Sequence, residues 1–140
     1  MFYRLALIFS LFIAAIPSPA FAESPYDDDL RHLAGELRAL MLHAEKRPSL
    51  DARERYDLGG SLFELQKKLN RLQEEAGSAN LALQRSGLPK SRELIFAASI
   101  AETLNLARAH TDAYLDTGDK AFSLAAANSA RLARDLMAAQ

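Results

Sequence analysis

The chain has 140 residues, with 17 Lys or Arg against 18 Asp or Glu, so its formal net charge is -1. This balance argues against general nucleic-acid binding, which needs a basic face. The chain contains no cysteine, which excludes disulfides, thiolate metal sites, thiol catalysis and covalent c-type haem attachment. We expect one domain at this length, and 49% apolar residues are enough for a hydrophobic core.

Residues 1–22 have the composition of a secretory signal peptide. Arg4 supplies a positive charge, residues 5–16 are almost entirely apolar, and an A-x-A tripeptide ends at Ala22. The apolar run is shorter than the ~20 residues that a membrane-spanning helix needs. We therefore predict a Sec-type signal peptide cleaved after Ala22, and one mature helical domain over 23–140. This domain is expected to be periplasmic or secreted, without a stable membrane span.

The first predicted helix follows Ser24 and ends at Arg47-Pro48-Ser49. Ser24 and Asp27 have the spacing of a capping box, and Pro25 suits the first helical position. The helix ends there because the residue before a proline disfavours helical geometry. Apolar residues recur every three or four positions and give this helix one apolar face: Tyr26, Leu30, Leu33, Leu37, Leu40 and Ala44.

The second predicted helix carries the longest apolar seam, which is Leu58, Leu62, Leu65, Leu69, Leu72, Ala76, Ala79 and Leu83. Two glycines inside a helix cost about 1 kcal/mol each relative to alanine. At Gly59-Gly60 we therefore expect either a short helix over 50–58 before a long one, or one helix kinked at the glycines. Ser61 begins a possible capping box for the first alternative. Gly87 ends the helix, with Leu88 placed for the accompanying hydrophobic contact.

The third predicted helix runs from about residue 91 to 116. Its seam is Ala97, Ile100, Leu104, Ala107, Thr111 and Tyr114. Residues 94–101 are apolar on nearly every face, and such a segment is either buried on several sides or meets a partner.

Gly118 and Asp119 form the next turn, and a fourth predicted helix follows them. Its seam is Phe122, Ala125, Ser129, Leu132 and Leu136. Short turns between long helices make neighbouring helices antiparallel. The sequence thus predicts an all-α, up-down-up-down antiparallel four-helix bundle.

The histidines are the candidate metal ligands of this sequence. His43 and His110 are expected at the same end of the bundle on diagonal helices, where Asp112 or Asp116 could join them around a metal ion. No phosphate-binding loop or nucleophile elbow occurs, and no histidine has the Glu-x-x-His spacing of di-iron bundles. We therefore expect no catalytic residue, no cofactor and no enzymatic activity.

Two stretches resemble secreted four-helix bundles of the cytochrome b562 type. They are the leucine rhythm from Asp27 to Leu40, and the final helix, where Thr117-Gly118 precedes Ala125-Ala126-Ala127, Arg131 and Arg134. The resemblance implies a bundle that holds haem between a methionine early in the first helix and a histidine late in the fourth. Leu30 and Ala138 stand at these positions, so both ligands are absent. His32 and Met137 are the neighbouring pair that could replace them.

The broad apolar surface of the third helix is the feature that favours a particular function. Leu94, Ile95, Ala98 and Ala101 lie beyond what one seam needs, and they could dock a second copy or another envelope protein. We predict a non-enzymatic protein-binding or accessory module. A haem or metal carrier is the alternative.

Overall fold

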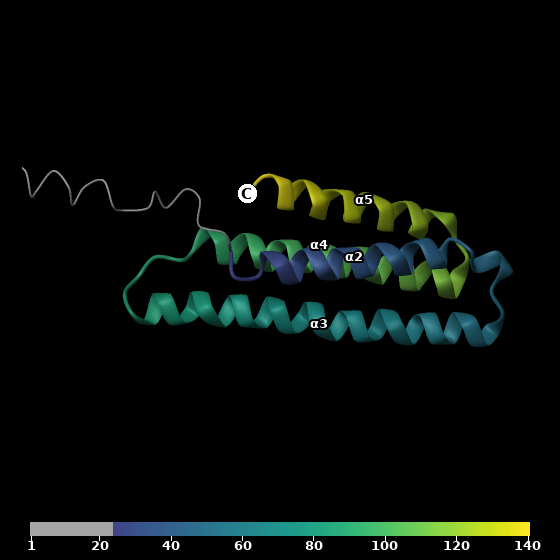
Figure 1. Ribbon diagram of the computed structural model, residues 1–140, viewed down its shortest axis with the longest axis horizontal. Helices are drawn as coiled ribbons and strands as arrows, with labels where there is room; N and C mark the ends of the chain where they lie inside the picture. Colours follow the sequence, from purple (N-terminus) through teal and green to yellow (C-terminus); the bar gives the residue numbers. More distant parts are fainter. Residues whose placement is uncertain (1–23) are drawn as a thin grey trace, which may run out of the picture.

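The computed structural model describes residues 24–140, so the predicted signal peptide and its cleavage site lie outside the described residues. Within this range the chain forms four α-helices and no strand. They are α2 (Asp27–Ala44), α3 (Ala52–Arg85), α4 (Arg92–Thr117) and α5 (Lys120–Ala138), with a 3-10 helix (Arg47–Ser49) between α2 and α3. Consecutive helices run in opposite directions (Figure 1), which confirms the predicted antiparallel four-helix bundle.

α4 is the central helix of this bundle. It packs along α3 and along α5, while α2 lies against both α3 and α4 and touches α5 at few places. In Figure 1, α3 and α5 lie on opposite sides of the pair formed by α2 and α4. A helix with neighbours on several sides must be apolar on several faces. The apolar breadth that the sequence shows in this helix is therefore largely used inside the bundle.

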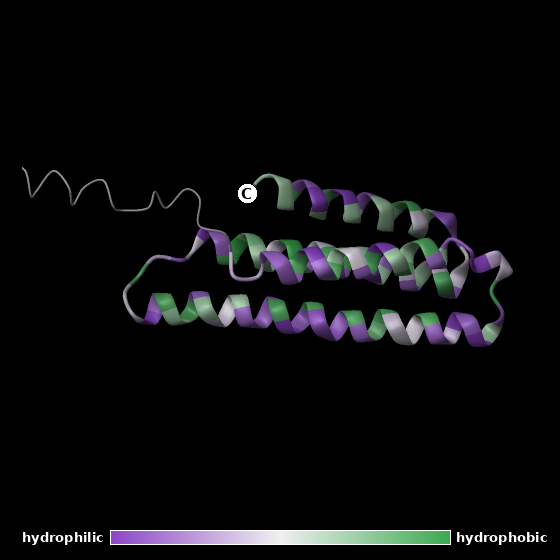
Figure 2. Ribbon diagram, viewed as in Figure 1, coloured by the Kyte–Doolittle hydropathy of each residue, from purple (hydrophilic) through white to green (hydrophobic). Residues whose placement is uncertain are grey.

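Leucines of α2 and α3 meet alanines and larger residues of α4 in the core. The main cluster consists of Leu30, Leu33, Leu37, Leu65, Leu69, Leu72, Ala76, Ala97, Ile100, Ala101, Leu104, Ala107 and Ala133. A second cluster consists of Ala44, Leu58, Leu62, Tyr114 and Leu115. Every seam residue predicted for the third helix is buried, and Figure 2 shows hydrophobic and hydrophilic residues alternating along α3.

α3 is one continuous helix of 34 residues, about 51 Å long at roughly 1.5 Å per residue. It starts at a complete capping box: the Asp51 carboxylate accepts a hydrogen bond from the Glu54 amide, and the Glu54 carboxylate accepts one from the Asp51 amide, both at 2.8 Å. Ser61 does not cap a second helix, because its hydroxyl donates to the carbonyl of Asp57 at 3.3 Å. The chain thus forms one helix and not a short helix followed by a long one, and Figure 1 shows no sharp kink in it.

The glycine pair lies inside α3 without breaking it. Leu58 and Leu62 on either side are 3% and 0% exposed, and tertiary packing of an apolar face outweighs weak helix propensity. Gly59 faces α4, since a Cβ built on it would lie 3.9 Å from Oδ1 of Asp112.

α5 packs by a face that only partly matches the predicted seam, since Phe122 and Leu136 of that seam pack against the two core clusters. Ala126 and Ala133 are buried, whereas Leu132 of the predicted seam is 53% exposed. Ala130 and Met137 also pack against the core. Positions 126, 130, 133 and 137 have the same four-three spacing as the predicted seam, and small side chains allow α5 to lie closer to α4. The leucine at position 132 was therefore wrongly placed in the interface.

Candidate docking surface at the end of the helical hairpin

The four predicted partner-binding residues differ widely in exposure. Ala101 is 0% exposed and belongs to the core, so it has no surface left for a partner and this part of the prediction is corrected. Leu94 and Ala98 are half-buried and pack against the same core. Ile95 is 46% exposed. Ile95 is thus the member of the predicted face that presents a large apolar surface.

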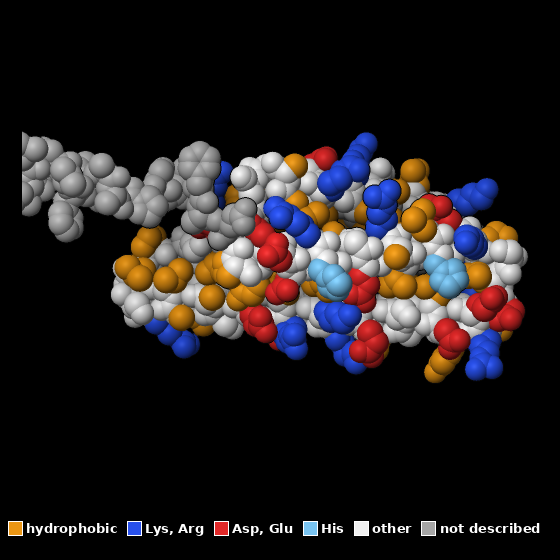
Figure 3. Space-filling model, in the orientation of Figure 1, with side chains coloured by type: hydrophobic (Ala, Val, Ile, Leu, Met, Phe, Trp, Pro, Cys, Tyr) orange, Lys and Arg blue, Asp and Glu red, His pale blue; other side chains and the backbone are white. Residues whose placement is uncertain are grey.

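Ile95 belongs to an end of the molecule where α3 and α4 project beyond the other helices. α3 and α4 have 34 and 26 residues, whereas α2 and α5 have 18 and 19. Figure 1 shows α3 and the loop after it extending past the ends of α2 and α5. We call residues 81–96 the hairpin end. Three of its large apolar side chains are exposed: Leu81 at 46%, Leu88 at 54% and Ile95 at 46%. In Figure 3, hydrophobic side chains gather over this end.

The loop at the hairpin end has a defined hydrogen-bonded form. Gly87 has a φ of 76°, and its amide donates to the carbonyl of Gln84 at 3.0 Å. The amide of Leu88 donates to the carbonyl of Leu83 at 2.9 Å. These two bonds are a Schellman motif, so the predicted end of the helix at Gly87 is confirmed. The Leu88 side chain, however, remains more than half exposed, and the fixed backbone holds it out at the tip.

Asn80 of α3 forms hydrogen bonds with the end of this loop that leads into α4. Its Oδ1 accepts a hydrogen bond from the amide of Ser91 at 2.7 Å, and its Nδ2 donates to the carbonyl of Ser91 at 3.4 Å. Ser91 in turn caps α4 through its hydroxyl, which accepts from the amide of Leu94 at 3.3 Å. Asn80 is only 8% exposed. The sequence analysis did not identify Asn80, because it placed the neighbouring Ala79 in the apolar seam. A helical spacing of four residues from Ala76 would have reached Asn80 instead.

Glu93 contributes the acidic group of this first turn of α4. Its backbone amide hydrogen bond lowers the pKa of its carboxyl, and the Ser91 hydroxyl, which donates to the carboxylate at 2.8 Å, lowers it further. The carboxylate is thus occupied in stabilising the start of the helix.

Among the described residues, the cations of the hairpin end have no acidic partner. Arg85, Lys90 and Arg92 are all exposed, and within residues 24–140 none of them lies within 4 Å of a carboxylate oxygen. The guanidinium carbon of Arg92 lies 5.4 Å from the ring centroid of Phe96. With Glu93 as its one carboxylate, the hairpin end carries a net charge of +2 in a chain whose total is -1.

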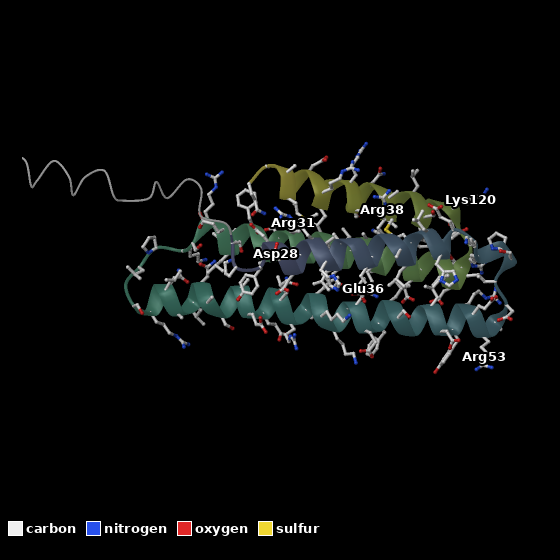
Figure 4. The ribbon with its side chains drawn as sticks, viewed as in Figure 1. Asp28, Arg31, Glu36, Arg38, Arg53 and Lys120 are labelled. Atoms are coloured by element: carbon white, nitrogen blue, oxygen red, sulfur yellow. The ribbon has the colours of Figure 1, made fainter. Side chains whose placement is uncertain are left out.

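The basic cluster in the middle of α3 is different, because its charges are neutralised locally. Lys67 lies 2.7 Å from Glu64, and Lys68 lies 3.0 Å from Glu36 of α2. Figure 4 shows Glu36 between α2 and α3. Arg53 and Arg55 at the start of α3 also have no carboxylate within 4 Å among the described residues. The hairpin end therefore differs from the rest of α3 by its net positive charge.

The predicted metal and haem ligands are spread over different surroundings. His32 and His43 are exposed on α2. His110 is half-buried, and its ring stacks on Phe122 of α5 with centroids 6.3 Å apart and planes 27° apart. Met137 packs against the core. Within residues 24–140, no three His, Cys, Asp or Glu side chains are grouped as metal ligands.

A polar bridge connects α3 to α4 near the middle of the bundle. Asn105 donates from Nδ2 to Oδ1 of Asn70 at 3.2 Å, and its own Oδ1 accepts from Nε of Arg108 at 2.8 Å. Burial lowers the pKa of Arg108. Burial also raises the pKa of Asp112, and the nearby negative charge of Asp116 raises it further. The Asn70–Asn105 bond joins α3 to α4, and Arg108 holds the Asn105 amide in place for it.

No family model, no curated protein and no solved structure matches this chain. The structure defines its class as an all-α, antiparallel four-helix bundle without cysteine. No helix within residues 24–140 has the length and apolar character needed to cross a membrane. The likeness to cytochrome b562-type bundles stays a prediction from the sequence.

Proposed function

We propose that this protein is a non-enzymatic binding module, periplasmic or secreted, that docks onto another component of its compartment through the hairpin end. The observation that carries this proposal is the exposure of Leu81, Leu88 and Ile95 on a projecting, hydrogen-bonded end of the bundle. Exposed apolar side chains gathered in one place are typical of interaction sites.

The hydrogen bonds of the loop support this proposal independently of exposure. A Schellman motif commonly has an apolar residue at this position to cover the last turn of the helix, but Leu88 is 54% exposed. Here the Schellman motif and the Asn80–Ser91 bonds hold the tip in one conformation. A tip held in one conformation loses little conformational entropy when it binds, so the hairpin end is suited to docking.

The alternative function, a haem or metal carrier, has weaker support. His32, the proposed replacement ligand for haem, is exposed, whereas Met137 is packed among apolar residues. His110 belongs to no group of three potential metal ligands within residues 24–140. An absorbance spectrum and a metal analysis of protein purified from its own compartment test this alternative directly.

A pair of matched double variants tests the docking proposal. Leu88→Asp with Ile95→Asp changes the hairpin end, and Leu124→Asp with Leu132→Asp changes two α5 leucines that are 65% and 53% exposed. Both variants add the same charge at exposed leucine or isoleucine positions. Helicity by circular dichroism and thermal unfolding establish that each variant folds.

The readout is site-specific photo-crosslinking in the native compartment, together with sedimentation of the purified protein to detect self-association. We expect the hairpin variant to lose its crosslinks or its self-association and the α5 variant to keep them. Equal behaviour of the two variants, or a folded hairpin variant with an unchanged crosslinking pattern, would overturn the proposal.

A further inference from the structure

We infer that the component docked by the hairpin end is an anionic phospholipid surface, to which the protein binds peripherally and reversibly. This inference rests on the proposed docking function and names its partner. It follows from three properties that occur together at one end of the molecule: projection, exposed apolar side chains and unpaired cations.

Projection favours a flat surface as the partner. The hairpin end extends past α2 and α5 (Figure 1), so it reaches a planar surface before the rest of the bundle does. Leu88 lies at the tip of the loop, and Leu81 and Ile95 lie on the two helices beside it. Apolar side chains in such a position can enter the boundary between lipid headgroups and acyl chains while the helices stay in water.

Charge determines which lipids the hairpin end fits. It holds three Lys or Arg and one Glu, whereas the rest of residues 24–140 holds 13 Lys or Arg and 16 Asp or Glu, a net charge of -3. An anionic surface therefore attracts the hairpin end and repels the rest of the protein. The same field orients the long axis of the bundle away from the membrane.

The positions of the cations suit a lipid interface. Long basic side chains place their stems along apolar surface and their charged groups in the headgroup layer. Arg92 does this already in the free protein, since its guanidinium group lies over the ring of the half-buried Phe96. Because Arg85, Lys90 and Arg92 have no carboxylate partner among the described residues, no ion pair has to break before they meet lipid phosphates.

The test is flotation of the purified protein with vesicles of phosphatidylglycerol and phosphatidylcholine, compared with vesicles of phosphatidylcholine alone. We expect binding to the anionic vesicles, weakening as salt is raised, and little binding to the neutral ones. Each unpaired cation near an anionic surface contributes about fivefold in affinity. Replacing Arg85, Lys90 and Arg92 together by Gln should therefore weaken binding by about 100-fold.

The apolar contribution is tested by Leu88→Asp against Leu124→Asp. The first variant should lower vesicle binding by about tenfold or more, since it removes an inserted side chain and adds a repelled charge. The second should change it by less than about threefold, because its added charge lies outside the hairpin end. The triple Gln variant alters exposed side chains only and thus keeps the test independent of folding.

Three results would overturn the inference: equal binding to neutral and anionic vesicles, binding that the triple Gln variant leaves unchanged, or equal effects of Leu88→Asp and Leu124→Asp. If vesicles do not bind while the hairpin variants still lose their crosslinks to a protein or to a second copy, the partner is a protein and docking itself stands. If neither readout responds to the hairpin variants, docking through this end fails as well.

Discussion

Replacing Gly118 by alanine should be among the most damaging single changes in the turn between α4 and α5. Gly118 has a φ of 70° and its amide donates to the carbonyl of Tyr114 at 2.8 Å, so it ends α4 in the left-handed conformation. A Cβ added there would lie 2.5 Å from one terminal nitrogen of Arg47 and 2.8 Å from its guanidinium carbon. The substitution therefore combines backbone strain with displacement of Arg47.

The size of the effect follows from these two contributions. Alanine in the left-handed region costs roughly 1–2 kcal/mol. Nε of Arg47 donates to the carbonyl of Leu115 at 2.8 Å, and a hydrogen bond to a charged group contributes about 1.5–3 kcal/mol, with the lower end fitting a half-buried side chain. Together they give a loss of about 2.5–4 kcal/mol in the free energy of unfolding, or roughly 10–15 °C in Tm for a domain of this size.

Gly87→Ala is the matched control for this experiment. Gly87 has a similar φ of 76°, but a Cβ there would meet nothing within 4 Å. Its replacement should cost only the backbone strain, about 1–2 kcal/mol. Urea denaturation of both variants, measured with an unchanged m-value, gives the comparison.

A double-mutant cycle with Arg47→Ala isolates the contact. In the Arg47→Ala background, Gly118→Ala should cost no more than Gly87→Ala does in the parent protein. If Gly118→Ala costs no more than Gly87→Ala in the parent, or if the Arg47 and Gly118 effects simply add, then Arg47 is not held against this turn and the reasoning is refuted.

Three further predictions concern the interior of the bundle. Asn80→Ala should cost about 1–3 kcal/mol in urea denaturation, because it leaves the amide of Ser91 without its partner; a loss below about 0.5 kcal/mol would contradict the role given to Asn80. Ala133→Leu should lower the free energy of unfolding by about 1–3 kcal/mol through overpacking, whereas Leu132→Ala should lower it by less than about 1 kcal/mol. A larger loss for Leu132→Ala than for Ala133→Leu would mean that Leu132 lies in the interface, as the sequence predicted. Asp112→Asn should raise stability at neutral pH by no more than about 1 kcal/mol. Burial raises the pKa of Asp112 above its ordinary 3.8. The protonated carboxyl therefore favours the folded state below pH 3.8, and this contribution to stability is lost as the pH rises through the raised pKa. The advantage of the Asn variant should thus disappear in unfolding measured at about pH 3, and an advantage that persists there would exclude this origin.

The candidate site was predictable only in part. The apolar breadth around Ile95 is visible in the sequence, and so is the turn at Gly87. The sequence could not show that Ala101 and Leu94 face other helices, since that depends on how many neighbours α4 has. Nor could it show that Leu88 stays exposed at the tip, because the ordinary hydrophobic contact of a Schellman motif would have covered it.

The sequence by itself determined the helices of this protein and most of their inner faces. Caps at Asp119 and Ser91 and stops at Gly87 and Gly118 act over a few residues, and the spacing of leucines defines a stripe on each helix whatever it packs against. The tertiary structure decided that the alanines of α5 are buried while its Leu132 is exposed, that α3 continues through Gly59-Gly60, and which other apolar residues remain exposed. These features depend on close packing among helices far apart in the chain, where small side chains permit approach and a central helix is covered on several sides.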